Sequence, residues 1–234
     1  MKNVVAPVKN VVAAQDAFDN LCNRSLGVPG IGLIHGETGY GKTTAVTYLF
    51  NQVNGIYVRA LSADTPSSLL GRVMGELGAQ PMARTARMVD YILEHMSMYE
   101  RPLFIDEADY LMDDVKLLET VRDLYDCTEV PVVLIGMDQI ARRISTRRQF
   151  FNRISEWVEF KPADLEDVQI AADAMLDDGI GIDVDLLDEL RRQAKGEMRT
   201  IAIGLDKIER LAKANELDCV TLAHWGSQPF KNNR

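Results

Sequence analysis

The sequence has few of the residues that build disulfide frameworks, metal centres or membrane spans. Its 234 residues include three cysteines and three histidines, and no two cysteines have the spacing of a zinc site. No apolar run reaches about 18 residues, so we expect no membrane-spanning helix. Residues 1–14 lack the long apolar core and the cleavage site of a signal peptide. These absences favour a reduced protein of the cytoplasm.

The chain also lacks a surplus of positive charge. It carries 26 Lys and Arg against 35 Asp and Glu, which gives a net charge of −9. The hydrophobic fraction of 47% is typical of a globular protein. The negative balance argues against a uniformly basic surface for nucleic acid, but it leaves room for a local basic patch. Residues 139–153 contain no acid and five arginines, namely Arg142, Arg143, Arg147, Arg148 and Arg153.

Short apolar runs alternate with helical patterns through the first 160 residues. We predict strands at 31–35, 55–60, 102–105, 130–136 and 155–160, and helices at 43–53, 67–77, 86–99 and 114–125. This alternation predicts an α/β domain with a parallel sheet flanked by helices. After Pro162 three helical patterns follow without a further strand. We therefore expect a helical lead-in over 1–29, an α/β domain over 30–161, a small helical domain over 162–218 and a tail over 219–234.

The lead-in contains a short repeat. Lys-Asn-Val-Val-Ala occurs at 2–6 and again at 9–13, and a spacing of seven predicts that both copies share one face of a helix. Pro7 stands between them and either breaks or starts that helix. Such a helix can pack on its own domain or dock on a neighbouring subunit.

The loop after the first predicted strand carries the strongest motif. Residues 36–43 fit G-x-x-x-x-G-K-[ST] in full, between a predicted strand and a predicted helix. Glycines let backbone N–H groups point at a phosphate, and the helix N-terminus adds the positive end of its dipole. We expect this loop to bind ATP, with Lys42 reaching the β- and γ-phosphates and the Thr43 hydroxyl ligating Mg²⁺. The predicted nucleotide-binding residues here are Gly36, Glu37, Thr38, Gly39, Tyr40, Gly41, Lys42, Thr43 and Thr44.

Two acids end the third predicted strand. We expect Asp106 to hold Mg²⁺, directly or through water, and Glu107 to orient or deprotonate the attacking water. We also expect this strand to lie next to the first one, which would bring the acids to the phosphate loop. The alternative is a pair of solvated acids at the start of an acidic stretch, but the loop requires a metal partner.

A phosphate loop, a later Asp-Glu pair and a trailing helical segment together resemble an AAA+ ATPase, and the resemblance covers nearly the whole chain. It implies an AAA+ P-loop NTPase fold with a small C-terminal helical lid. It also implies that Asp138 occupies the place of the first sensor, where the family usually has an amide. Arg153 would be the arginine finger, with Arg147 and Arg148 as rivals. Arg199 would be the arginine of the second sensor.

Within the AAA+ proteins, the chain is most similar to the phage Mu transposition protein B family. The similarity rests on Val8–Ala13 before the phosphate loop and on Gly196–Arg199 before an Ile- and Leu-rich helix. It implies ATP-dependent assembly of a homo-oligomer, as a ring or helical filament, on duplex DNA without sequence preference. It also implies delivery of target DNA to a transposase and activation of that transposase. A phage origin would place the protein in the bacterial host cytoplasm.

Several arginines are candidates for contacts with the DNA backbone. Arg84 and Arg87 follow the second predicted strand and its helix, and Arg142 and Arg143 belong to the arginine-rich stretch. The alternative is a solvated surface, or arginines that pair with acids of an adjoining subunit. The tail over 221–234 can dock a partner or pack on the lid.

Two other functions remain open from the sequence. One is an AAA+ ATPase of the secretion or pilus type, whose relatives carry long membrane-binding and peptidoglycan-binding extensions. The other is a nucleotide switch that acts on proteins without contacting DNA. Stimulation of ATP turnover by duplex DNA would distinguish the DNA-binding transposition ATPase from both of these alternatives.

Overall fold

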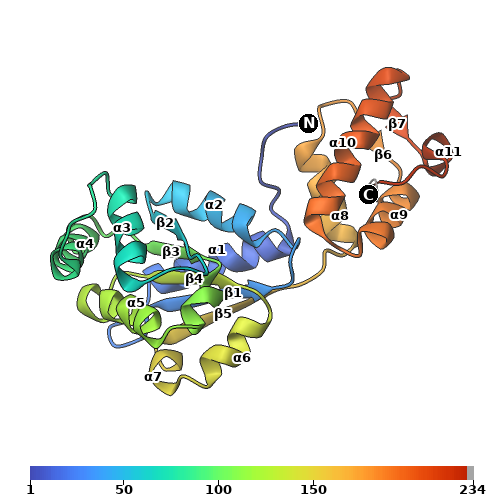
Figure 1. The fold of residues 1–234 in the computed structure, drawn as a ribbon. Helices are drawn as coiled ribbons and strands as arrows, with labels where there is room; N and C mark the ends of the chain where they lie inside the picture. The colour runs from blue at the N-terminus through green and yellow to red at the C-terminus, as the bar shows by residue number, and fades with distance from the viewer. Residues whose placement is uncertain (231–234) are drawn as a thin grey trace. The chain divides into compact units, whose positions relative to one another are not determined.

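The computed structural model describes residues 1–230, which fold as two compact units (Figure 1). We call the first the sheet unit; it contains Ala13–Gly36 and Val46–Glu159. The second, the lid unit, contains Met1–Val12, Glu37–Ala45 and the chain from Phe160 onward. The phosphate-loop residues after Gly36 thus share a compact unit with the C-terminal helices.

A five-stranded sheet forms the centre of the sheet unit, in the order β2-β3-β4-β1-β5. The strands are β1 (Ile31–Gly36), β2 (Ile56–Arg59), β3 (Leu103–Asp106), β4 (Val132–Gly136) and β5 (Ile154–Phe160). The pairs β1–β4, β3–β4 and β2–β3 are parallel. All of β3 and β4 is buried, as expected for strands covered on both faces. The predicted α/β fold with a parallel sheet flanked by helices is confirmed.

The expected position of the acidic strand is wrong. β4 lies between β3 and β1 and pairs with both, with Ile34 opposite Ile135 and Ile105 opposite Leu134. Strand order is set by the crossovers that connect strands, and the apolar runs of single strands do not encode it. Because β1 and β3 both run parallel to β4, they still end at the same edge of the sheet.

Helices surround the sheet and begin where the sequence offers caps. The Thr65 side chain accepts a hydrogen bond from Ser68 at the start of α3, where Pro66 fits the first turn. Asp114 accepts one from the Lys116 N–H at the start of α5. The helices before β5 are α1 (Lys9–Cys22), α2 (Lys42–Gln52), α3 (Pro66–Glu76), α4 (Thr85–Tyr99), the short 3₁₀ helix η1 (Ala108–Met112), α5 (Val115–Thr128), α6 (Gln139–Ser145) and α7 (Arg148–Phe151).

The N-terminal repeat does not form one helix. α1 begins at Lys9, so the copy at residues 2–6 lies outside it, and the prediction that both copies share a helix face is wrong. The segment packs on its own chain. The Asn10 side chain donates to the Lys161 carbonyl (2.8 Å) and accepts from the Lys161 N–H (3.1 Å). The Lys9 N–H donates to the buried carboxylate of Asp167 at 2.8 Å.

Three helices of the lid unit form where helical patterns predict them. These are α8 (Leu165–Met175), α9 (Val184–Ala194) and α10 (Met198–Ala214). The expectation of no further strand is wrong, because β6 (Gly181–Ile182) pairs in parallel with β7 (Cys219–Val220). Two-residue strands are too short to show an alternating pattern. Gly196 turns the chain between α9 and α10 with φ of +73°, and a Cβ there would lie 2.6 Å from Pro162 Cβ.

The described part of the tail packs within the lid unit. The rings of Trp225, in α11 (Leu222–Trp225), and Phe230 are stacked with centroids 4.6 Å apart. Both side chains are buried, and the indole N–H of Trp225 donates to the Gln228 carbonyl at 2.8 Å. Residues 219–230 therefore follow the packed alternative. The basic end of the proposed docking peptide, residues 231–234, lies outside the described residues.

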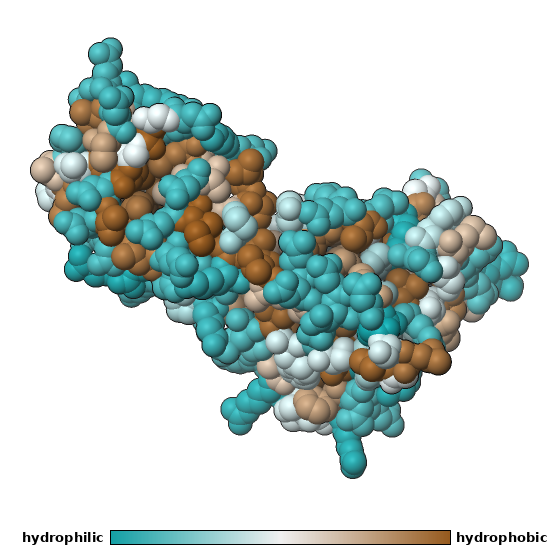
Figure 2. Space-filling model, turned by 180° about the vertical axis from the view of Figure 1, so that it is seen from behind, coloured by the Kyte–Doolittle hydropathy of each residue, from teal (hydrophilic) through white to brown (hydrophobic). Residues whose placement is uncertain are grey.

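The surface is largely hydrophilic, with smaller hydrophobic areas visible on both units from behind (Figure 2). Among the described residues, no helix has both the length and the apolar character that crossing a membrane requires.

Candidate nucleotide-binding site

The phosphate loop leaves β1 at Gly36 and leads into α2. Gly39 and Gly41 have φ of +92° and +94°, a region that side chains with a Cβ rarely adopt. The Gly41 carbonyl accepts from the Ala45 N–H at 3.0 Å, which closes the first turn of α2. The Lys42 ammonium donates to the Glu37 carbonyl at 2.9 Å, across the loop. The N-terminus of α2 carries the positive end of the helix dipole, which suits an anion such as a phosphate.

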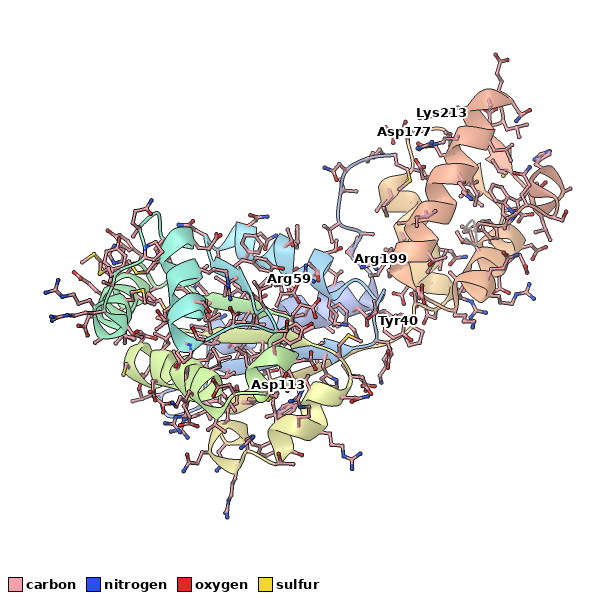
Figure 3. All side chains as sticks on the ribbon, in the orientation of Figure 1. Tyr40, Arg59, Asp113, Asp177, Arg199 and Lys213 are labelled. Carbon is pink, nitrogen blue, oxygen red and sulfur yellow. The ribbon has the colours of Figure 1, made fainter. Side chains whose placement is uncertain are left out.

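The first residues of α10 contact this loop within the lid unit. The Arg199 N–H donates to the Gly39 carbonyl at 3.1 Å. A Cβ on Gly39 would lie 3.3 Å from the Glu197 side chain, so glycine permits this close approach. Arg199 itself is exposed, and Figure 3 labels it together with Tyr40 of the loop. The structure therefore brings the predicted second-sensor arginine to the predicted phosphate site.

Asp106, the last residue of β3, is held by two donors. Its side chain is 6% exposed. The Glu107 N–H donates to Oδ1 at 2.8 Å, and the Tyr57 hydroxyl of β2 donates to Oδ2 at 2.7 Å. Burial, followed by this hydrogen bond to Asp106, raises the pKa of Tyr57 above its ordinary value, so the hydroxyl keeps its proton.

Glu107 forms an ion pair with the neighbouring strand. Its Oε1 lies 2.8 Å from Nη2 of Arg59, the last residue of β2, which stands opposite Asp106 in the sheet. Figure 3 labels Arg59. The hydrogen bond to Glu107 raises the pKa of Arg59, which stays charged. Glu107 also has φ of +54°, an uncommon value for a residue with a Cβ. The carboxylate of Glu107, which we predict to activate water, is thus paired with Arg59 in this structure.

Two side chains of these elements carry oxygen ligands of the kind that Mg²⁺ prefers. They are the Thr43 hydroxyl in the first turn of α2 and the Asp106 carboxylate at the end of β3. Within residues 1–230 no three His, Cys, Asp or Glu side chains form a metal cluster. Mg²⁺ held by one or two protein oxygens, nucleotide phosphates and water needs no such cluster.

The end of β4 carries the predicted first sensor. Asp138 is half-exposed, and its Oδ1 lies 3.7 Å from Nδ1 of His35. That buried nitrogen has no hydrogen-bond partner among the described residues. Asp109, which follows the acidic pair, accepts from the Met137 N–H at 2.7 Å and so ties η1 to the end of β4.

Two arginines of the basic stretch are paired within the chain. Arg153 Nε lies 2.7 Å from Asp126 Oδ1, and Arg143 Nη2 lies 2.6 Å from Asp113 Oδ1. The stretch is two helices, α6 and α7, and three of its arginines are exposed without an ion pair among the described residues. These three are Arg142, Arg147 and Arg148. A concave surface on this side is lined by Met112, Asp138, Gln139, Arg142, Arg143, Thr146 and Arg147.

The other two predicted DNA contacts lie on a separate element. Arg84 immediately precedes α4 and Arg87 belongs to its first turn, and both are exposed. Neither side chain has an ion pair within the described residues. Arg84 and Arg87 at the start of α4, and Arg142 and Arg143 on α6, are thus two separate basic positions of the sheet unit.

Sequence reasoning missed three residues of this region. Tyr57 and Arg59 contact the two acids from β2, and Asp109 fastens the following turn. A signal exists for the first two, because alternate residues of a strand point to one face and parallel neighbours end together. No pattern marks Asp109, which stands in a run of acids.

The sequence of this chain matches a known domain family and a bacterial protein. A family model described as an AAA domain matches residues 26–144, just over half of the chain. A Staphylococcus aureus protein described as a potential ATP-binding protein is 24% identical over 244 residues, covering 87% of this chain and 89% of that protein.

Solved structures with the same fold include two proteins of Aeropyrum pernix. The Aeropyrum pernix ORC2 protein, solved in ADPNP–ADP complexes, has a TM-score of 0.73 at 16% identity, covering 96% of this chain and 68% of that one. The Aeropyrum pernix ORC1 protein in complex with DNA has a TM-score of 0.64 at 15% identity, covering 95% and 64%. This chain thus spans about two thirds of these proteins, and such identities show the fold alone. The AAA match over residues 26–144 covers β1, the phosphate loop, the Asp-Glu pair and β4, and the chain belongs to the AAA family of P-loop ATPase domains.

Proposed function

We propose that this protein is a Mg²⁺-dependent ATPase that assembles on duplex DNA and delivers target DNA to a transposase, which it activates. One observation carries the ATPase part: a complete phosphate-loop motif follows β1, and Asp106 and Glu107 end β3 at the same edge of the parallel sheet. In parallel α/β sheets, ligands bind beyond the carboxyl ends of the strands.

Each residue of the proposed site has its own role in ATP hydrolysis. Lys42 neutralises the β- and γ-phosphates, while Thr43 and Asp106 supply oxygen ligands for Mg²⁺. The metal, when bound, polarises the phosphate and offsets its charge. Glu107 takes the proton of the attacking water once it leaves Arg59. Asp138 and Arg199 act as the two sensors of the nucleotide, and Arg199 already stands at the loop through its N–H.

An arginine of a neighbouring subunit completes the site. Arg153 is our choice, and its side chain is one third exposed although it pairs with Asp126. A cation that reaches the γ-phosphate only from a second subunit makes hydrolysis depend on assembly. Arg147 and Arg148 are the alternatives, because both are exposed without an ion pair in the described chain.

The DNA part rests on the distribution of charge and on the fold. The net charge of −9 predicts weak binding by a single chain. Repetition of a few exposed arginines along a ring or filament adds backbone contacts without sequence preference. Arg84, Arg87, Arg142 and Arg143 are the candidates. Proteins with this fold include the ORC1 protein solved with DNA, which supports the proposal without identifying the site. The proposal of a transposase as partner rests only on the resemblance of residues 8–13 and 196–199 to the phage Mu transposition protein B family.

The experiment measures ATP turnover with and without nonspecific duplex DNA, at several salt concentrations. We expect DNA to raise turnover, and electron microscopy with a nonhydrolysable ATP analogue to show rings or filaments on DNA. The effect should fall steeply with salt, because backbone contacts release counterions. Turnover that ignores DNA, together with absent assemblies, would exclude the DNA part and leave the ATPase.

A nucleotide switch that acts on proteins is the second candidate. The in-chain pairing of Arg143 and Arg153 favours it, because paired arginines are less available to phosphates. It predicts nucleotide-dependent binding of a protein partner and turnover that does not respond to DNA.

A further inference from the structure

A tyrosine outside the predicted site holds the carboxylate of Asp106. Tyr57 lies on β2, the neighbour of β3, and its hydroxyl donates to Asp106 Oδ2 at 2.7 Å. The Glu107 N–H donates to the other oxygen at 2.8 Å. A donor on each oxygen fixes the plane of the carboxylate, which is the group proposed to hold Mg²⁺.

The ring of Tyr57 is itself fixed by packing. It stacks on Phe50 with centroids 5.0 Å apart and an interplanar angle of 22°. Phe50 lies in α2, the helix that begins with Lys42, and it also contacts Phe104 of β3. Gly55 leaves the space for this arrangement, because a Cβ there would lie 2.7 Å from the Phe104 ring. The ring of Tyr57 is therefore held by Phe50 of α2, which in turn packs against Phe104 of β3.

We propose that Tyr57 is a positioning residue that sets the metal affinity of the site by orienting Asp106. The inference rests on the proposed function, since it concerns the Mg²⁺ of the same ATPase site. Partners that hydrogen-bond a metal-ligating carboxylate typically change metal affinity by about 10- to 100-fold when they are removed. Asp106 would hold the metal, and Tyr57 would act on it only through Asp106.

If the Tyr57 ring served only for packing, Tyr57→Phe would leave metal affinity unchanged. This substitution keeps the stack on Phe50 and removes only the hydroxyl donor, so it separates the orientation of Asp106 from the packing of the ring. Tyr48→Phe is the matched control, because Tyr48 is an exposed tyrosine of the same helix α2. Asp106→Asn supplies the background in which the proposed partner of the hydroxyl is altered.

The experiment titrates Mn²⁺, followed by electron paramagnetic resonance, into protein saturated with a nonhydrolysable ATP analogue. For Tyr57→Phe we expect the half-saturating Mn²⁺ concentration to rise by about tenfold or more. Affinity for a fluorescent ATP analogue in EDTA should stay unchanged, as should both readings for Tyr48→Phe. Adding Tyr57→Phe to Asp106→Asn should cause no further loss, since both changes act on one contact.

Two results would overturn the inference. One is a Tyr57→Phe protein that binds Mn²⁺ as the wild type does. The other is a further full loss in the Asp106→Asn background, which would show that Tyr57 acts elsewhere. A wild-type protein that binds no nucleotide in EDTA or with Mn²⁺ would instead refute the proposed function, and this inference with it.

Discussion

The edge of the sheet at Asp106 and the arginine-rich segment of α6 and α7 differ in how much of their chemistry one chain completes. At the sheet edge, Tyr57, Arg59 and the Glu107 backbone engage both acids, and the contacts come from adjacent strands. In the arginine-rich segment, three of five arginines have no ion pair within the described chain. We propose that the first region serves a reaction within the chain and that the second binds another molecule.

The largest effect tests whether the second region completes the first. Arg153→Ala should reduce assembly-dependent turnover by about 10³- to 10⁵-fold, the usual contribution of an arginine finger. Nucleotide binding by the isolated chain should be unaffected, as measured with a fluorescent ATP analogue. Asp126→Asn is the matched control, because it frees Arg153 from its ion pair and should not lower turnover. Full turnover in Arg153→Ala would move the role to Arg147 or Arg148.

The next effect lies at the sheet edge itself. Glu107→Gln should lower turnover by about 10²- to 10⁴-fold, because the amide cannot accept the proton of water. ATP should still bind and assemblies on DNA should last longer, which electron microscopy at fixed times can measure. Glu94→Gln, an exposed position of α4, serves as the control. Normal hydrolysis in Glu107→Gln would show that another group activates the water.

Lys42→Ala should weaken nucleotide binding by about 10- to 100-fold, the value of a hydrogen bond to a charged group. Isothermal titration with ATP and Mg²⁺ measures the loss. A thermal unfolding curve without nucleotide should stay close to that of the wild type, since the hydrogen bond from Lys42 to the Glu37 carbonyl is exposed to solvent. Wild-type affinity in this variant would place the phosphates elsewhere.

The smallest effect separates two adjacent arginines. Arg142→Gln should reduce the slope of log affinity for duplex DNA against log salt by about 0.9 if it removes one phosphate contact. Arg143→Gln should change the slope less, because Arg143 is paired with Asp113. Equal changes would indicate that the ion pair opens on DNA. No change in either would direct attention to Arg84 and Arg87.

The sequence predicted most of the fold because its signals are local. Apolar runs such as residues 31–35 and 130–136 are buried parallel strands, and Asp114 caps a helix as such residues do. The order of strands was not local, so the placing of β3 beside β1 failed. The pairing of β6 with β7 was missed because two residues carry no period.

The candidate site likewise contains residues that a local motif predicts and contacts that depend on distant parts of the chain. Residues 36–43 carry their chemistry in consecutive positions, so a motif could predict them; their binding of ATP stays a prediction. The contacts of Tyr57 and Arg59 with the two acids depend on β2 lying beside β3. These two strands are far apart in the sequence, so no local pattern predicts that they pair. The partner of Arg153 depends in turn on how α5 lies against the start of β5.

The buried stack of Trp225 on Phe230 has a practical consequence for spectroscopy. The chain has two tryptophans, and one lies in each unit: Trp157 is 37% exposed on β5, while Trp225 is 3% exposed in the lid unit. Fluorescence from Trp157 should be quenched by iodide and that from Trp225 should be protected. Single replacements by Phe would give each unit its own intrinsic optical reporter, without any added label.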